Sequence, residues 1–289
     1  MEYILEYLEY LNYIKMHSVH TINNYKIDLV QFMEFNDNDL ISVDRNCVNK
    51  YMYYLYDKGV SKKTIARKLS SLRSFYNYLY KKNIVNKNYF INVKNPKMDK
   101  GLPKLVKDND IDKMFLIPNK KTTLGQRNLL IIRMLYATGV RVSELVNIKL
   151  KDINIKDRTI RIMGKGSKER IVVFGNNTVE ILELYLSSGR HRLDKNNSNY
   201  LFLNKDGNRL SDRYVRNIIN DIIFKASIDI NVSPHMLRHT FATDMLNNGA
   251  DLVSVKDLLG HESLNTTSIY THVSDDKIRE VYNNSHPRA

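Results

Sequence analysis

Cysteine, glycine, proline and long apolar runs are scarce in parts of this 289-residue chain, and each scarcity excludes a class of protein. The single cysteine, Cys47, excludes an internal disulfide and a cysteine-rich metal site. No stretch approaches the roughly 18 consecutive apolar residues of a membrane-spanning helix. The N-terminus, MEYILEYLEY, carries glutamates where a signal peptide has basic residues. We therefore expect a globular cytoplasmic protein without a membrane partner.

The charge is strongly basic and unevenly distributed. The net charge of the chain is +14, and it divides into −6 for residues 1–44, +12 for residues 45–100 and +8 for residues 101–289. A basic excess this concentrated favours a surface for a polyanion such as DNA. A lysine-rich solvated surface is the alternative, and charge alone does not separate the two.

The first hundred residues hold one glycine, Gly59, and one proline, Pro96, which together with apolar periodicity predicts a bundle of helices. We predict four helices, at about 2–16, from Ser18 through Phe32, at 44–58 and at 61–82. In the first of them, Ile4, Leu8, Leu11 and Met16 are expected to face the core.

The helix predicted at 61–82 has two distinct faces. Its apolar residues repeat at spacings of four and three, and they are Ile65, Leu69, Leu72, Tyr76 and Leu79. The opposite face combines basic residues with serines, namely Lys63, Arg67, Ser70, Ser74 and Lys81. Cations neutralise a phosphate backbone and short hydroxyl side chains permit close approach, so this face is a candidate DNA-binding surface. An ordinary solvated face is the competing interpretation.

Residues 92–106 contain two prolines, a glycine and several lysines without periodicity, which predicts a linker between a domain at 1–91 and a second at 107–289. In the second domain, TIRIM (159–163) and ERIVVF (169–174) predict a β-hairpin around GKGSK. The rest is expected to be helical, at 108–116, 125–137, just after Arg141, and at 177–187, 211–226, 234–248, 251–258, 263–271 and 275–283. The fold class is therefore mainly α, a four-helix bundle followed by an α+β domain with a small antiparallel sheet.

Several enzyme signatures are missing. The string GKGS lacks the upstream glycine of a phosphate-binding loop, since Thr159 occupies that position. HMLRH (235–239) lacks the glutamate of the zinc-protease pattern, and no dense carboxylate cluster suggests magnesium. We expect neither a metal nor a cofactor.

Cationic and histidine residues instead stand at unusual local positions. Arg141 follows the turn ATGV and precedes a helical segment that contains Glu144. His235 and Arg238 follow Ser233 and Pro234, which predict the cap and first residue of a helix. A helix N-terminus beside such side chains suits a phosphate. A cap with a structural histidine is the simpler alternative.

Four strings resemble, in order and spacing, the signature segments of tyrosine recombinases, the phage-integrase family of DNA-breaking and joining enzymes: TGVRVSEL, GKGSKER, HMLRHTFATDML and LLGHESLNTTSIYTHV. The N-terminal bundle is similar to the SAM-like core-binding domain of that family. The length and the terminal NNSHPRA are similar to the Xer branch, which resolves chromosome dimers in bacteria.

The resemblance implies a role for each matching residue. Tyr270 is the nucleophile, which attacks a scissile phosphate to give a 3′-phosphotyrosyl link and a free 5′-hydroxyl. Arg141 and Arg238 hold the non-bridging oxygens, a task suited to guanidinium groups that keep their charge. His261 bonds to the same oxygens or positions the phosphate.

Three further residues carry implied supporting roles. Lys165 protonates the leaving 5′-oxygen, and His235 assists proton transfer at the tyrosine. Glu144 orients its neighbours rather than reacting. Because the phosphotyrosyl link keeps the energy of the broken bond, rejoining needs no ATP, and the cations take the place of a metal.

The resemblance also implies partners and a setting. These are a double-stranded DNA recombination site, such as a dif-like chromosomal site used during cell division, and a homo- or hetero-tetramer that exchanges strands through a Holliday junction. The last helix, 275–283, and the tail Ser285–Ala289 are expected to dock on a neighbouring protomer, with Val281 and Tyr282 as apolar contacts. A DNA translocase is a candidate activator.

Three alternatives remain at this stage. An integrase or resolvase of a mobile element would use the same chemistry. A DNA-binding protein that no longer cuts is opposed by the intact set of residues. A type IB topoisomerase shares the nucleophile, but the N-terminal bundle and tail fit it less well.

Overall fold

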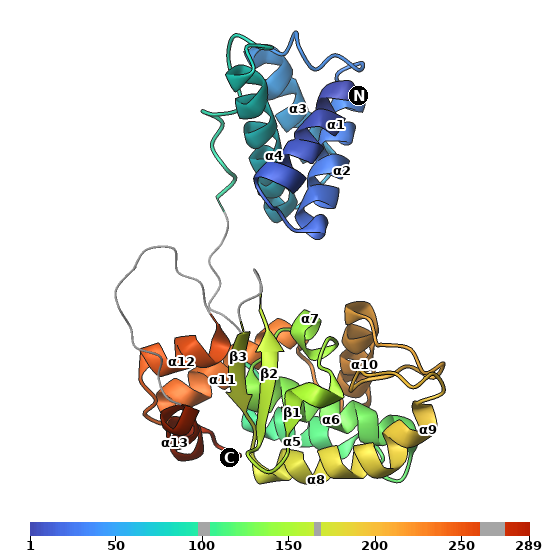
Figure 1. Ribbon diagram of the computed structural model, residues 1–289. Coiled ribbons are helices and arrows are strands. Elements are labelled where there is room, and N and C mark those ends of the chain that lie inside the picture. Colours follow the sequence, from blue (N-terminus) through green and yellow to red (C-terminus); the bar gives the residue numbers. More distant parts are fainter. Residues whose placement is uncertain (98–104, 165–168, 261–274) are drawn as a thin grey trace. The chain divides into compact units, whose positions relative to one another are not determined.

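The chain forms two compact units, Met1–Leu102 and Pro103–Ala289. The computed structural model describes residues 1–97, 105–164, 169–260 and 275–289, and each unit is considered by itself (Figure 1). Within these ranges, no helix is both long and apolar enough to cross a membrane.

The N-terminal unit is a bundle of four helices, as predicted. They are α1 (Glu2–Glu9), α2 (Val19–Phe35), α3 (Arg45–Asp57) and α4 (Lys62–Lys81). Three of them begin at side-chain caps, because the oxygens of Ser18, Asp44 and Ser61 accept hydrogen bonds from backbone N–H groups three residues later. These caps explain why the helix starts were readable from the sequence.

The end of the first helix differs from the prediction. α1 passes at Tyr10 into a π-helical turn, Tyr10–Ile14, and the chain then reverses at Met16 with a positive φ of 49°. Met16 is 82% exposed, so its placement in the core was wrong. The π-turn shifts the register of the apolar face, and Leu11 becomes the last buried residue of this segment.

Helix α4 buries the apolar face that the sequence predicted. Its five predicted residues, Ile65, Leu69, Leu72, Tyr76 and Leu79, are all at most 1% exposed. On another side of the same helix, the guanidinium of Arg67 and the ammonium of Lys68 pair with the fully buried carboxylate of Asp28. The hydroxyl of Ser71 also donates to this carboxylate at 3.1 Å. These bonds fix α4 to α2 through a polar network.

Arg73 extends the bundle beyond α4. Its Nε donates to the carbonyl of Phe90 at 3.1 Å, and its Nη2 donates to Asn95 Oδ1 at 3.0 Å. The bundle therefore holds the chain as far as Asn95.

The second unit is mainly helical and carries a three-stranded antiparallel sheet in the order β1-β2-β3. Its helices are α5 (Asp108–Leu116), α6 (Thr123–Thr138), α7 (Val142–Leu145), α8 (Asn176–Leu184), α9 (His191–Leu193), α10 (Asp212–Lys225), α11 (Pro234–Asn247), α12 (Leu252–Leu259) and α13 (Asp275–Ser285). The predicted hairpin is confirmed as β2 (Thr159–Met163) and β3 (Glu169–Val173), paired from Thr159–Val173 to Met163–Glu169. The helix predicted at 263–271 lies outside the described residues.

Strand β1 (Ile153–Asn154) was missed. Two residues are too short to show a period of two, and the strand exists because it pairs with Ile160 and Thr159 of β2.

Helix α6 is the centre of the second unit. Twelve of its residues are buried, and it packs against α8, α11 and β3. Within this unit, α9 and α10 lie on one side of the sheet, and α11, α12 and α13 lie on the other (Figure 1). The ends of α6, α12 and β3 meet where the candidate site forms.

Candidate active site

The turn after α6 places Arg141 and Glu144. Gly139 ends α6 in the left-handed region, with φ of 60°, and a Cβ there would lie 2.5 Å from the Phe241 ring. The chain therefore turns at once into α7, whose cap residue is Arg141. The backbone N–H of Arg141 donates to Glu144 Oε2 at 2.8 Å, and its Nη1 donates to Glu144 Oε1 at 2.8 Å.

Glu144 is also held from the sheet by Arg170 of β3. The Nη1 and Nη2 of Arg170 donate to the two carboxylate oxygens at 3.0 and 2.8 Å, a two-pronged pair. Burial of Glu144 by itself raises the pKa of its carboxyl, but the bonds from Arg170 and from the N–H and guanidinium of Arg141 outweigh burial and lower the pKa below its ordinary value. Glu144 is therefore a carboxylate fixed by two arginines.

Arg238 reaches the same place from α11. Ser233 caps this helix and Pro234 is its first residue, as predicted. Arg238 is 5% exposed; its Nη1 donates to the carbonyl of Gly139 at 2.5 Å and its Nη2 to that of Leu259 at 2.6 Å. Two backbone carbonyls, at the ends of α6 and α12, thus hold this guanidinium.

The site has a net positive charge. Burial, and next the nearby charge of Arg141, lower the pKa of Arg238 to about 10, so it stays charged at neutral pH. Among the described residues, two guanidinium groups, those of Arg141 and Arg170, are bonded to the carboxylate of Glu144, and a third, that of Arg238, lies close enough to feel its charge. Arg141 is also 44% exposed at its side chain, whereas that of Arg170 is 12% exposed. The site can therefore receive an anion from solvent at Arg141.

The structure brings together some of the predicted catalytic residues. Arg141, Glu144 and Arg238 form the cluster, and His235 is exposed in the first turn of α11, one turn before Arg238. Lys165, His261 and Tyr270 lie outside the described residues. Lys165 falls in the sequence between β2 and β3, and His261 directly follows Gly260, which ends α12.

Sequence reasoning missed Arg170. Its only signal was its place as the last residue of GKGSKER, and nothing in the local sequence indicates a partner 26 residues away. On the strand it is half-buried, between an exposed Glu169 and a half-buried Ile171.

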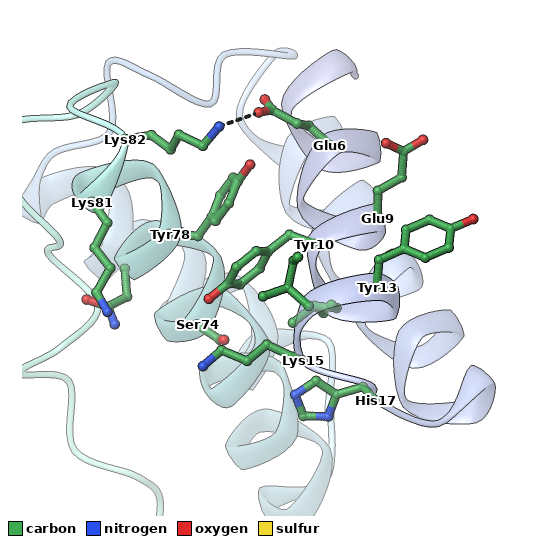
Figure 2. Close-up of a pocket in the computed structure, with 13 residues that line it drawn as sticks. Glu6, Glu9, Tyr10, Tyr13, Lys15, His17, Ser74, Tyr78, Lys81 and Lys82 are labelled. Carbon is green, nitrogen blue, oxygen red and sulfur yellow. Dashed lines mark hydrogen bonds and ion pairs between the residues drawn. The ribbon is translucent and has the colours of Figure 1, made fainter.

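The candidate DNA-binding residues of α4 differ in their exposure and in their bonded partners. Lys63 and Ser70 are exposed, whereas Arg67 pairs with Asp28. Ser74 and Lys81 line a pocket of about 760 Å³ between α4 and the α1 segment (Figure 2).

The opposite wall of that pocket holds acidic residues beside Lys15 and His17. It carries Glu6 and Glu9 (Figure 2), and Glu6 accepts a hydrogen bond from Lys82 Nζ at 2.8 Å. Glu6 therefore compensates the charge of Lys82 at the C-terminal end of α4.

The last helix and the tail pack on their own unit. Helix α13 contacts α11, α12 and β3. Tyr282 is fully buried, and His286 stacks on it with ring centroids 4.8 Å apart. Arg288 Nη2 donates to Asp112 Oδ1 at 2.9 Å and its guanidinium lies 5.2 Å from the centre of the Tyr136 ring. In the single chain, the apolar contacts expected for a neighbour are thus made internally.

Comparison with known proteins identifies the class. The sequence pattern described as the phage integrase family matches residues 104–277, and that described as the phage integrase N-terminal SAM-like domain matches residues 4–83. The chain belongs to the phage integrase family, and it is a tyrosine-type site-specific DNA recombinase.

Three similar relatives are all Xer recombinases. The chain is 44% identical over 272 residues to the tyrosine recombinase XerC of Oceanobacillus iheyensis, covering 92% of this chain and 89% of that protein. It is also 44% identical to the tyrosine recombinase XerC of Anoxybacillus flavithermus, covering 92% and 91%. Among solved structures, the XerH site-specific recombinase in a post-cleavage complex with a palindromic difH substrate is 29% identical, with a TM-score of 0.69 over 90% of this chain and 78% of that one.

Proposed function

We propose that this protein cuts and rejoins DNA at a specific chromosomal site through a 3′-phosphotyrosyl intermediate and so resolves chromosome dimers during cell division, in the cytoplasm. The observation that carries the proposal is the arginine cluster, where the described residues place three guanidinium groups near one carboxylate, two of them bonded to it. A phosphodiester supplies the missing negative charge. Cleavage increases that charge in the transition state, so the cluster binds the transition state more strongly than the substrate.

Arg238 and Arg141 would divide the work on the phosphate. A guanidinium has five N–H donors, and within the described ranges protein acceptors take two of those of Arg238. Both carbonyl partners belong to helix ends. The two bonds therefore fix the orientation of the guanidinium and of its remaining N–H donors. Arg141 is exposed and still anchored by Glu144, so it can approach from the solvent side.

The chemical step uses His235 of α11 and three residues outside the described structure, Lys165, His261 and Tyr270. The oxygen of Tyr270 forms a bond to phosphorus while the bond from phosphorus to the 5′-oxygen breaks, and the electron pair leaves with that oxygen. Lys165 supplies the proton to the 5′-oxygen, and His235 takes the tyrosine proton. His261 would donate a hydrogen bond to the phosphate. Attack of a 5′-hydroxyl reverses the sequence and reseals the strand without ATP.

Residues 1–91 would hold the DNA, with residues 92–106 as linker and 107–289 as the catalytic part. Lys63, Ser70, Ser74 and Lys81 are proposed to face the phosphate backbone, and the basic charge of residues 45–100 supports this assignment. Arg67 would contribute less, because Asp28 already compensates its charge. The structure of XerH with its difH substrate shows a similar recombinase on its recombination site.

Assembly would involve the C-terminal segment. In a tetramer around two duplexes, α13 and the tail Ser285–Ala289 would leave their own unit and occupy the equivalent surface of a neighbour, of the same or a second recombinase, as strands exchange through a Holliday junction. The internal packing of Tyr282 and His286 supports this, because a surface that fits the segment within one chain fits the same segment from another. A DNA translocase is the proposed activator.

A nicked duplex that carries a candidate chromosomal recombination site tests the proposal. Cleavage beside the nick releases a short fragment and traps the covalent protein–DNA adduct, which survives detergent. We expect the adduct with the wild type and none with Tyr270→Phe. Tyr53→Phe, at a tyrosine 74% exposed on α3, is the matched control and should keep the adduct.

Three results would contradict the proposal. An undiminished adduct in Tyr270→Phe would remove that residue from the reaction, and no adduct from the wild type on nicked chromosomal sites would favour a protein that binds without cutting. An adduct on the ends of a mobile element but not on chromosomal sites would assign the chemistry to an integrase instead.

A further inference from the structure

Arg170 joins three segments of the site that are far apart in the sequence. Its Nη1 and Nη2 bind both oxygens of Glu144 in α7, and its Nε donates to the carbonyl of Leu258 in the last turn of α12 at 3.1 Å. Each of its three nitrogens therefore has a protein acceptor. A guanidinium used in this way is occupied by the protein and is not the group that meets the DNA.

The end of α12 is shaped around this side chain. Gly260 ends the helix in the left-handed region, with φ of 62°, and a Cβ on it would lie 3.0 Å from Arg170 Cδ and 3.2 Å from Nε. The chain thus passes closely over the guanidinium immediately before His261. Arg238 holds the neighbouring carbonyl, that of Leu259, so two guanidinium groups take up carbonyl groups that the helix end leaves unpaired.

Glu144 connects Arg170 to Arg141. One carboxylate oxygen, Oε1, accepts from both Arg141 Nη1 at 2.8 Å and Arg170 Nη1 at 3.0 Å. With Arg170 in place, the negative charge of Glu144 is compensated by Arg170 as well as by Arg141. The attraction between Glu144 and the exposed Arg141 is therefore weaker. Without Arg170, Arg141 would be the one cation among the described residues still bonded to the buried carboxylate, which would hold it away from the phosphate.

We infer that Arg170 is a positioning residue for strand cleavage: it fixes Glu144, and through Glu144 the guanidinium of Arg141, while it ties β3 to the end of α12. This inference rests on the proposed function. It assigns to the β-hairpin a task besides carrying Lys165, namely to align two arginine-bearing segments.

The test measures the rate of adduct formation on the nicked substrate at saturating DNA, together with DNA affinity and thermal midpoint. Arg170→Ala should slow adduct formation by up to about 100-fold, the scale of a misplacement of about 1 Å in a reacting group. DNA affinity should change by less than about threefold, because Arg170 is not a phosphate contact. Arg170→Lys keeps the charge but not the two-pronged geometry and should be intermediate. Arg161→Ala, at an exposed arginine on β2, is the matched control.

A double variant separates positioning from simple support of the fold. In the Arg170→Ala background, Glu144→Gln removes the carboxylate that would hold Arg141, so the rate should rise above that of Arg170→Ala alone. In the wild-type background, the same change should lower the rate. If Arg170 only supported the fold, the two losses would multiply.

The outcomes are distinct. Three outcomes would each overturn the inference while the wild-type adduct still upheld the proposed function. The first is an Arg170→Ala rate within twofold of wild type. The second is a loss that weaker DNA binding, or unfolding of the variant at the assay temperature, fully accounts for. The third is multiplied losses in the double variant. Absence of the wild-type adduct would instead overturn the proposed function.

Discussion

Arg238 is a buried guanidinium whose bonded partners, in the part of the chain that the structure describes, are two backbone carbonyls, those of Gly139 and Leu259. Carbonyls hold its geometry without neutralising its charge, and burial has already removed much of its hydration. Both conditions cost free energy in the unliganded protein. An incoming phosphate offsets this cost, so the arginine is prepared for the anion before it arrives.

Arg238→Lys is expected to preserve the charge and lose the fork that bridges two helix ends. Adduct formation should fall by about 100- to 1000-fold, as for loss of one preorganised donor at a developing oxyanion. Single-turnover cleavage on the nicked duplex measures this, with DNA affinity measured in parallel. A rate within a few-fold of wild type would show that a point charge suffices.

Glu144 predicts a dependence of stability on pH. Because the pKa of its carboxyl is lowered in the folded protein, its contribution is complete above its ordinary pKa of 4.5 and is lost as pH falls through the folded value. Glu144→Gln should therefore narrow the difference in unfolding free energy between pH 7 and pH 3. Chemical denaturation at the two pH values measures it, and an unchanged difference would mean that the arginine bonds do not stabilise the carboxylate in solution.

Among the helices and strands, the sequence predicted the features that local chemistry determines, such as the helix starts. Ser18, Asp44, Ser61 and Ser233 cap the helices that the sequence placed after them. The prediction failed at Met16, where a π-turn changes the helical period, and no local pattern marks such a turn.

The candidate site was only partly predictable for a related reason. Motif resemblance located Arg141, Glu144 and Arg238, whose side chains do lie together. The links that assemble them are tertiary: Arg170 to Glu144 spans 26 residues, and Arg238 to Gly139 spans 99. Similarly, the pair between Arg67 and Asp28 joins α4 to α2 and is invisible in the periodicity of α4.

Helix α4 predicts different effects for two of its cations. Lys63→Ala should weaken DNA binding and reduce the slope of log affinity against log salt by about 1, with stability unchanged. Arg67→Ala should instead lower stability by about 1–2 kcal/mol, since it removes one partner of the buried Asp28 while Lys68 remains. Salt titrations and denaturant unfolding of each variant measure the two effects. Equal slopes of log affinity against log salt for wild type and Lys63→Ala would show that this face is solvated and does not contact DNA.

The C-terminal element carries a second pH effect. Burial lowers the pKa of His286 to about 4, and the nearby charge of Arg288 lowers it further; the unfolded chain therefore binds the proton more tightly. Its stabilising contribution is complete above pH 6.5 and is lost as pH falls toward 4, which amounts to about 2 kcal/mol at pH 5.

His286→Phe keeps an aromatic ring beside Tyr282 and removes the titration. The variant should lose less stability than wild type between pH 7.5 and pH 5, as measured by thermal or denaturant unfolding. Tyr53→Phe, at an exposed position of α3, retains His286 and is the control. Parallel pH profiles for wild type and His286→Phe would show that the histidine is not buried in its neutral form.

For the whole molecule, charge and chemistry divide between the two units. Residues 45–100 carry most of the net positive charge, and the second unit holds the arginine cluster at the ends of α6, α12 and β3. The spread charge of residues 45–100 suits many phosphates along a DNA backbone, and the arginine cluster suits a single phosphate. A site-specific recombinase needs both, because recognition extends over many base pairs while cleavage concerns one bond.

The most direct measurement is the identity of the residue that becomes attached to DNA. The adduct formed on a nicked duplex with a candidate chromosomal site is trimmed with nuclease, digested with protease and examined by mass spectrometry. The account predicts a nucleotide on the peptide that contains Tyr270, linked through its 3′-phosphate, with a free 5′-hydroxyl on the released strand. A nucleotide attached to another residue, or through a 5′-phosphate, would contradict it.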